Sequence, residues 1–326
     1  KLTNDFGPLR FIGQLEVEYT DGSTQTFATD DSWKYTENTP YTFCSWYGGE
    51  DYDANRATQE SLQADIDSWR NAVLCTDTIG KLKAQYYQPT DVVETWHPVS
   101  IKTMSDGDYL IDFGQNFAGQ YEFTLKGTKG QTIQLWPAEL LNAQGSIDQF
   151  QIGSPVYDQY TFSGETDGET WGPTLVYHGF RYLLVKGLDK APSVNQFIAK
   201  RIRLGVKQTG SFSCSNNLLN DIHTLIVRSI ASNLYNSLTD CPHREKLGWL
   251  EVPQLLYNSL VFNFDLAAWM PKVAMDTRDS QHDNGYVCNV APGLFQLNDF
   301  WGNDPSWGGS TILVPYRSYL TYGDVQ

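Results

Sequence analysis

The sequence predicts a multidomain fold in which β-structure comes first and helices follow. The chain has 326 residues, which is more than one ordinary domain requires. Apolar and polar residues alternate in short runs before residue 210, and the apolar period lengthens to that of a helix near residue 212. Because alternating βα units would mix the two periods, this order indicates an all-β part that precedes an all-α part.

The segment 13–27 predicts a β-hairpin. Leu15, Val17 and Tyr19 alternate with polar residues, so they share one face of a strand. Asp21 and Gly22 then supply a turn that leads into a second alternating run.

Further strands are predicted in segments 109–140, 174–188 and 195–206, where the alternation recurs between turn residues. Short strands at this spacing are typical of β-sandwiches. The region 60–95 has no clear period, and the prolines near its end place a domain boundary close to residue 95.

Four helical segments are predicted after residue 212. Ser215 is positioned to cap the first, in which apolar residues recur at helical spacing from Leu218 to Leu234. The other three span 255–264, 265–281 and 310–324. Asp265 opens the third segment, and Pro271 must then lie in its first turn or kink the helix.

The composition excludes several classes of function. A net charge of −15 and a pI near 4.6 oppose a phosphate backbone, so we expect no nucleic-acid partner. No stretch of eighteen apolar residues occurs, so we expect no membrane partner. The five cysteines and five histidines are scattered without ligand spacing. We therefore expect no disulfide framework, no metal and no cofactor.

The segment TDCPHREKLGW, residues 239–249, concentrates chemically useful side chains. Asp240 and a proline two residues later predict the start of a helix, on which Glu245 and Trp249 lie four residues apart. A carboxyl group held against an indole is desolvated, which raises its pKa and lets it donate a proton near neutral pH. Arg244 is placed to contact Asp240 or a sugar hydroxyl. A plain helix start, with solvated charges and Trp249 in the core, fits the same residues.

This segment resembles the motif that opens the catalytic domain of bacterial α-L-rhamnosidases of glycoside hydrolase family 78. Four further matches follow the family's order along the chain. They are WYGGEDYDANR (46–56), IDFGQNFAGQYEF (111–123), YHGFRYLLVKG (177–187), and NDPSWGG (303–309) with VPYRSYLTYGD (314–324).

The resemblance implies two β-sandwich domains followed by the first part of an (α/α)6 barrel. The expected divisions are 1–94 for a partial N-terminal sandwich and connector, 95–208 for the second sandwich, and 209–326 for the start of a truncated barrel. The implied activity is hydrolysis of a terminal α-L-rhamnosyl bond with inversion, on a rhamnose-containing oligosaccharide or glycoside.

The resemblance also implies roles for individual residues. Glu245 is the general acid, and a base set farther away activates water. The family's base lies downstream of the position that matches Gln326, so we expect this chain to hold only part of the site. Substrate contacts are expected from Asp240, His243, Arg244, Trp249, Trp301 and Trp307. Ordinary barrel core fits Trp301 and Trp307 equally well.

One departure from the family opens an alternative. The family continues Gly-Trp-x-Gly-Asp, whereas this chain has GWLEV, with Val252 at the place of the sugar-binding Asp. A family of lyases that cleave L-rhamnose from α-1,4-linked glucuronate shares part of the motif, and His243, Arg244 and Lys246 offer base and clamp candidates for that reaction. A glycan-binding module without catalysis is a separate alternative, because the two sandwiches resemble carbohydrate-binding domains and the segment 41–52 is rich in aromatic residues.

Overall fold

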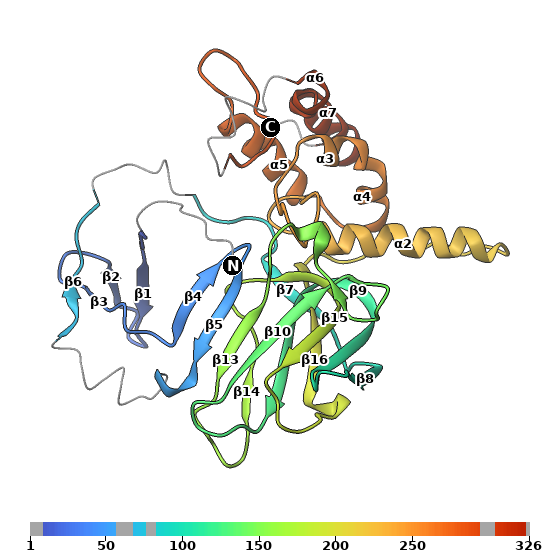
Figure 1. Ribbon diagram of the computed structural model, residues 1–326. Coiled ribbons are helices and arrows are strands. Elements are labelled where there is room, and N and C mark those ends of the chain that lie inside the picture. Colours follow the sequence, from blue (N-terminus) through green and yellow to red (C-terminus); the bar gives the residue numbers. More distant parts are fainter. Residues whose placement is uncertain (1–8, 57–67, 76–82, 294–303, 324–326) are drawn as a thin grey trace.

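The computed structural model describes residues 9–56, 68–75, 83–293 and 304–323. Its strands run up to Leu204, and helices α2 to α7 follow (Figure 1). The predicted order, β-structure before helices, is confirmed.

The predicted hairpin is present as β1 (Gln14–Glu18) and β2 (Thr24–Ala28), which pair antiparallel around Gly22 in the left-handed conformation. Its predicted apolar face is exposed: Leu15 is 61% accessible and Phe27 46%. The alternation therefore predicted the strands correctly, but not the burial of one face within the described part of the chain.

One large sheet dominates the β part (Figure 1). Its strands are β4 (Tyr41–Ser45), β5 (Gly49–Asp53), β7 (Thr90–Trp96), β8 (Ser100–Thr103), β9 (Tyr109–Leu125), β10 (Thr132–Ala138), β13 (Asp158–Thr161), β14 (Glu169–Trp171), β15 (His178–Lys186) and β16 (Phe197–Leu204). The main path runs β4-β5-β13-β10-β15-β9-β16-β7, and β8 and β14 pair with β9 beside it. Strand β5 pairs parallel with β13, which joins the N-terminal segment to this sheet.

Shorter elements complete the β part. They are the pair β3 (Lys34–Tyr35) and β6 (Arg70–Asn71), the pair β11 (Leu140–Leu141) and β12 (Ile147–Asp148), and the 3-10 turns η1 (Ala54–Arg56), η3 (Phe150–Ile152) and η4 (Val194–Gln196).

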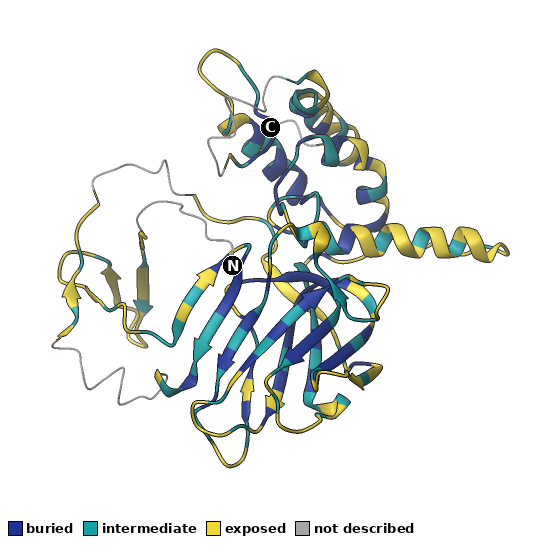
Figure 2. Cartoon of the chain, in the orientation of Figure 1, coloured by how far each residue is buried: buried dark blue, intermediate teal, exposed yellow. Residues whose placement is uncertain are grey.

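The core of the large sheet is aromatic. Phe117, Tyr121, Phe123 and Phe180 are almost completely buried, and their rings meet those of their neighbours edge-on or tilted. Aromatic pairs at these distances stabilise a core beyond the burial of their area. Figure 2 shows the buried residues running along the strands of this sheet.

A buried polar network lies beside this core. Asp158 accepts hydrogen bonds from Tyr121 Oη at 2.6 Å, His178 Nε2 at 2.8 Å and the Glu50 amide at 2.8 Å. Burial alone would raise the pKa of Asp158, but the charge of His178 and these hydrogen bonds hold it below its usual value. Glu50 in turn accepts the amide of Leu175 at 2.8 Å and that of Thr174. The network therefore fixes residues near 50 to residues near 176.

The helical part contains six described helices. They are α2 (Asn217–Asn233), α3 (Glu251–Leu255), α4 (Tyr257–Asn263), α5 (Trp269–Asp279), α6 (Pro305–Gly308) and α7 (Ser310–Tyr322). The predicted caps are wrong by a few residues. Asn216 rather than Ser215 caps α2 by accepting the amide of Leu218, and α5 has its N-cap at Ala268 instead of Asp265. Pro271 lies in the first turn of α5, as predicted.

The apolar stripe predicted for α2 is split between core and solvent. Ile230 and Leu234 are buried, whereas Leu218, Ile222 and Leu225 are exposed. The exposed end projects away from the rest of the described chain (Figures 1 and 2). No described helix is both long and apolar enough to cross a membrane.

The buried Glu50 predicts a pH-dependent stability. Burial raises its pKa from 4.5 to about 7, so between these values the folded protein holds one more proton than the unfolded chain. The contribution of Glu50 to stability therefore falls as pH rises from 4.5 to 7, and the full penalty is present above 7. As pH rises from 5 to 8, the free energy of unfolding of Glu50→Gln should therefore increase relative to that of wild type, by up to about 3 kcal/mol.

Thermal unfolding of both proteins at these two pH values measures this gain. Glu165→Gln changes an exposed carboxylate near the same sheet and serves as the control. An equal difference between Glu50→Gln and wild type at both pH values would show that Glu50 is not protonated in the folded state.

Candidate active site

Residues 239–249 form a loop with a turn at 242–245, so the helix predicted at this place is wrong. Asp240 closes the loop instead of capping a helix. Its carboxylate accepts the amide of Leu247 at 3.1 Å, and its own amide donates to the Leu247 carbonyl at 3.1 Å. Lys246 has a φ of +52°, which a right-handed helix does not allow. The local residues do favour a helix start, but these cross-loop bonds override that preference.

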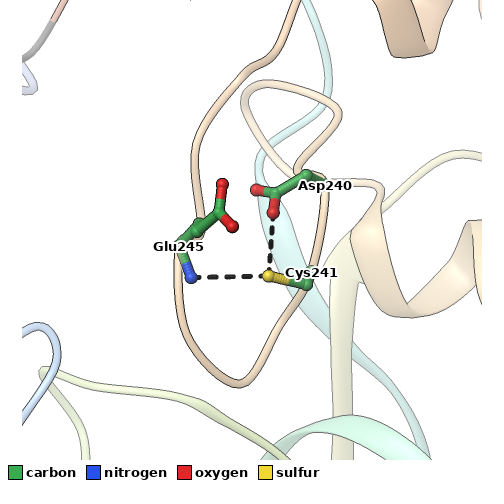
Figure 3. Close-up of side chains that lie close together, drawn as sticks. All are labelled: Asp240, Cys241 and Glu245. Atoms are coloured by element: carbon green, nitrogen blue, oxygen red, sulfur yellow. Dashed lines mark hydrogen bonds between the residues drawn. The ribbon is translucent and has the colours of Figure 1, made fainter. Parts of the chain in front are cut away.

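Asp240, Cys241 and Glu245 face one another across this loop (Figure 3). The Cys241 thiol donates to Asp240 Oδ2 at 2.8 Å and accepts the amide of Glu245 at 3.4 Å. Their possible ligand atoms lie within 4.8 Å of one another, close enough for one metal ion. Burial and the hydrogen bond to Asp240 raise the pKa of the Cys241 thiol. We interpret the cluster as the hydrogen bonding of the loop.

Glu245 and Trp249 lie together, although no helix places them. Trp249 Nε1 donates to Glu245 Oε2 at 2.9 Å, while Arg244 Nε lies 3.5 Å from Glu245 Oε1. The Glu245 side chain is 39% exposed. The indole therefore holds one oxygen of the carboxylate, and the group remains open to an incoming ligand.

The other predicted contact residues take different places. Trp307 lies next to Trp249, with ring centroids 6.3 Å apart and an interplanar angle of 65°. His243 turns toward the large sheet, where its Nδ1 lies 3.4 Å from Glu139 Oε2. Arg244 approaches Glu245 instead of Asp240, one of its two predicted partners. Trp301 falls outside the described residues.

Lys246 is the main feature of the site that sequence reasoning missed. It is only 5% exposed, and its Nζ donates to the carbonyls of Trp46 at 2.9 Å and Tyr177 at 2.6 Å. Burial lowers the pKa of Lys246 to about 7. Neither partner is near it in the sequence, so no local pattern distinguishes it from a solvated lysine. The clamp role considered for Lys246 in the lyase alternative is wrong, because the ammonium is not accessible to a substrate.

Tyr47 also reaches the loop from the N-terminal segment. Its hydroxyl donates to the Glu245 carbonyl at 2.6 Å. Burial, followed by the nearby charges of Asp240 and Glu245, raises the pKa of Tyr47 to about 12, so the hydroxyl keeps its proton. The peptide that carries Glu245 is thus bound from outside the helical part.

Val252 stands where the family's motif has a sugar-binding Asp. It packs against the core of the helical part, so this position offers no polar contact to a sugar. The adjacent Glu251 is the first residue of α3 and is partly exposed.

Comparison with known proteins matches three consecutive domains along the chain. Residues 3–94 match the α-L-rhamnosidase N-terminal domain, residues 102–203 the bacterial α-L-rhamnosidase concanavalin-like domain, and residues 207–326 the bacterial α-L-rhamnosidase six-hairpin glycosidase domain. The chain belongs to the bacterial α-L-rhamnosidase family.

Members of this family from several organisms resemble the chain. An α-L-rhamnosidase of Formosa agariphila is 30% identical over 98% of this chain and 35% of its own length. The solved α-L-rhamnosidase of Dictyoglumus thermophilum is 33% identical with a TM-score of 0.87, over 94% of this chain and 35% of that one. That of Streptomyces avermitilis, complexed with L-rhamnose, is 27% identical with a TM-score of 0.88, over 96% and 30%. The chain spans about a third of the length of these relatives.

Asp240 should stabilise the fold of the 239–249 loop. Asp240→Ala leaves the Leu247 amide and the Cys241 thiol without their acceptor, and an unpaired, partly buried donor costs about 1–3 kcal/mol. We expect the free energy of unfolding in denaturant to fall by this amount. Asp221→Ala removes an exposed acid of α2 and should stay within about 0.5 kcal/mol of wild type. Equal stabilities of the two variants would contradict the loop-closing role.

Proposed function

We propose that the protein hydrolyses terminal α-L-rhamnosyl linkages in glycosides or plant polysaccharides, with inversion of configuration. The observation that carries the proposal is the Glu245 carboxylate, held by the indole N–H of Trp249 in the loop that opens the six-hairpin domain, yet open to a ligand. Membership of the family supports the reaction class, and the Streptomyces avermitilis relative, complexed with L-rhamnose, supports the sugar.

We assign Glu245 as the general acid that protonates the leaving oxygen. An inverting enzyme places its two carboxyl groups about 6.5–9.5 Å apart to leave room for water. Asp240 lies nearer than that to Glu245, since their facing oxygens are within 4.8 Å, so it does not fit the role of base. We assign the base to no residue of this chain.

Asp240 fits a sugar-binding role. Each of its oxygens accepts one protein donor, which leaves further lone pairs of the carboxylate for sugar hydroxyls. Arg244 is 47% exposed and supplies donors beside Glu245. Trp249 and Trp307 form an aromatic corner for the apolar face of a deoxy sugar. His243 and Trp301 stay in the proposed substrate-binding set.

For the fold, we propose two β-sandwich domains and the first part of an (α/α)6 barrel. The division at 1–94, 95–208 and 209–326 is supported by the three domain matches, whose bounds lie close to these positions. The concanavalin-like description of the second domain and the six-hairpin description of the third support the same architecture.

Glu245→Gln tests the proposed acid. The amide cannot donate the proton, so release of rhamnose from a simple alkyl α-L-rhamnoside by the full-length protein should fall by at least about 100-fold. Released rhamnose is measured together with ultraviolet absorbance on a rhamnose-capped glucuronate oligosaccharide. Glu165→Gln, which changes an exposed carboxylate near the large sheet, should retain full activity.

Two outcomes would overturn the proposal. Full activity of Glu245→Gln would exclude Glu245 as the acid. New absorbance that rises in step with released rhamnose would show elimination across the uronate ring instead of hydrolysis.

A further inference from the structure

The only lysine of the 239–249 loop is bound to backbone outside the helical part. Lys246 Nζ donates to two carbonyls, Trp46 O at 2.9 Å and Tyr177 O at 2.6 Å. The same nitrogen lies 5.2 Å from the centroid of the Trp46 ring and 4.4 Å from that of Tyr177, within the range of cation–π attraction. One ammonium thus ties the loop to two segments that are distant in the sequence.

Those two segments are held rigidly to each other. Trp46 lies shortly before Glu50, which accepts the amides of Thr174 and Leu175. Tyr177 precedes His178, which is bound to the buried Asp158, and Asp158 also accepts the amide of Glu50. The carbonyls that Lys246 binds therefore have fixed positions.

Lys246 also constrains the backbone of Glu245, the residue before it. Lys246 has a φ of +52°, a left-handed conformation that costs a non-glycine residue about 1–2 kcal/mol and requires the surroundings to hold it. Tyr47 Oη holds the other end of the same peptide through the Glu245 carbonyl at 2.6 Å. The backbone of Glu245 is thus fixed on both sides by side chains that do not belong to the proposed substrate-binding set.

Apolar packing would not explain a lysine here. An unbranched apolar side chain would occupy the same volume without the cost of burying a charge. It could not bind two carbonyls, and it would leave them without a donor. The ammonium therefore provides a fixed geometry that an apolar residue cannot provide.

We propose that Lys246 is a positioning residue, which clips the loop bearing Glu245 to the N-terminal segment and the large sheet so that the acid reaches the leaving oxygen. This inference rests on the proposed role of Glu245 as the acid. Proton transfer needs heavy atoms about 2.6–3.2 Å apart, and a displacement of about 1 Å can cost about 100-fold in rate. The clip therefore acts on kcat.

Lys246→Met tests the proposal by its dependence on the leaving group. The full-length protein is assayed on an alkyl α-L-rhamnoside, whose leaving oxygen needs protonation, and on a dinitrophenyl α-L-rhamnoside, whose leaving group departs without it. We expect kcat on the alkyl substrate to fall at least about tenfold, with kcat on the dinitrophenyl substrate and both KM values nearly unchanged. Glu245→Gln should show the same selective loss in larger measure.

Two further variants separate positioning from loss of stability. Tyr47→Phe removes a single hydroxyl from the other side of the peptide and should show the same selective loss, smaller in size, with little change in Tm. Lys272→Met is the matched control, because Lys272 is also buried and donates to a backbone carbonyl, that of Asn236, and its ion-pair partner is Asp276 of α5. Lys272→Met should have the same relative effect on kcat for both substrates.

The outcomes distinguish this inference from the proposed function. Equal losses of Lys246→Met on both substrates, or no loss on either, would overturn the positioning role. If wild type releases no rhamnose from any substrate, the proposed function fails. Hydrogen exchange then tests the clip alone, since Lys246→Met should speed exchange of the Lys246 and Leu247 amides while Lys272→Met should not. Unchanged exchange in Lys246→Met would refute the clip itself.

Discussion

The candidate site depends on a buried ammonium group that binds two backbone carbonyls. The 239–249 loop has no regular secondary structure, so helix or sheet hydrogen bonds cannot fix its shape. Lys246 supplies the missing constraint by binding Trp46 and Tyr177, and Asp240 closes the loop from within. The proposed general acid must be placed to within a fraction of an ångström, and tertiary contacts of the loop would provide that precision.

Buried charged side chains connect the core of the large sheet to the 239–249 loop. Glu50 and Lys246 are both removed from water, and burial raises the pKa of the first and lowers that of the second to about 7. Asp158 accepts the amide of Glu50 and its charge acts on Lys246, and His178 and Tyr121 hold the pKa of Asp158 below its usual value. Each group binds backbone donors or acceptors of segments distant in sequence, so the polar network joins the N-terminal segment, the sheet and the loop into one support.

Local patterns predicted where strands and helices occur better than they predicted which of their residues are buried. The hairpin, strands β9, β10, β15 and β16 of the large sheet, and the helix that begins near residue 216 occur where alternation or helical spacing predicts them. The exposed Leu15 and Leu218 do not lie where amphipathic patterns would place them, because a pattern identifies an apolar face but not what covers it. At 239–249 the local signals favoured a helix start, and bonds across the loop overrode them.

The sequence by itself determined the order of β and α parts, the family, and the segment on which Glu245 and Trp249 lie. These depend on periodicity and on a contiguous motif, which are written along the chain. Only the tertiary structure decided that Trp249 binds Glu245 through its indole N–H, and that Lys246 is buried against Trp46 and Tyr177. Some 200 and 69 residues separate Lys246 from these two partners, and contacts over such distances arise only when the sheet and the helices pack together.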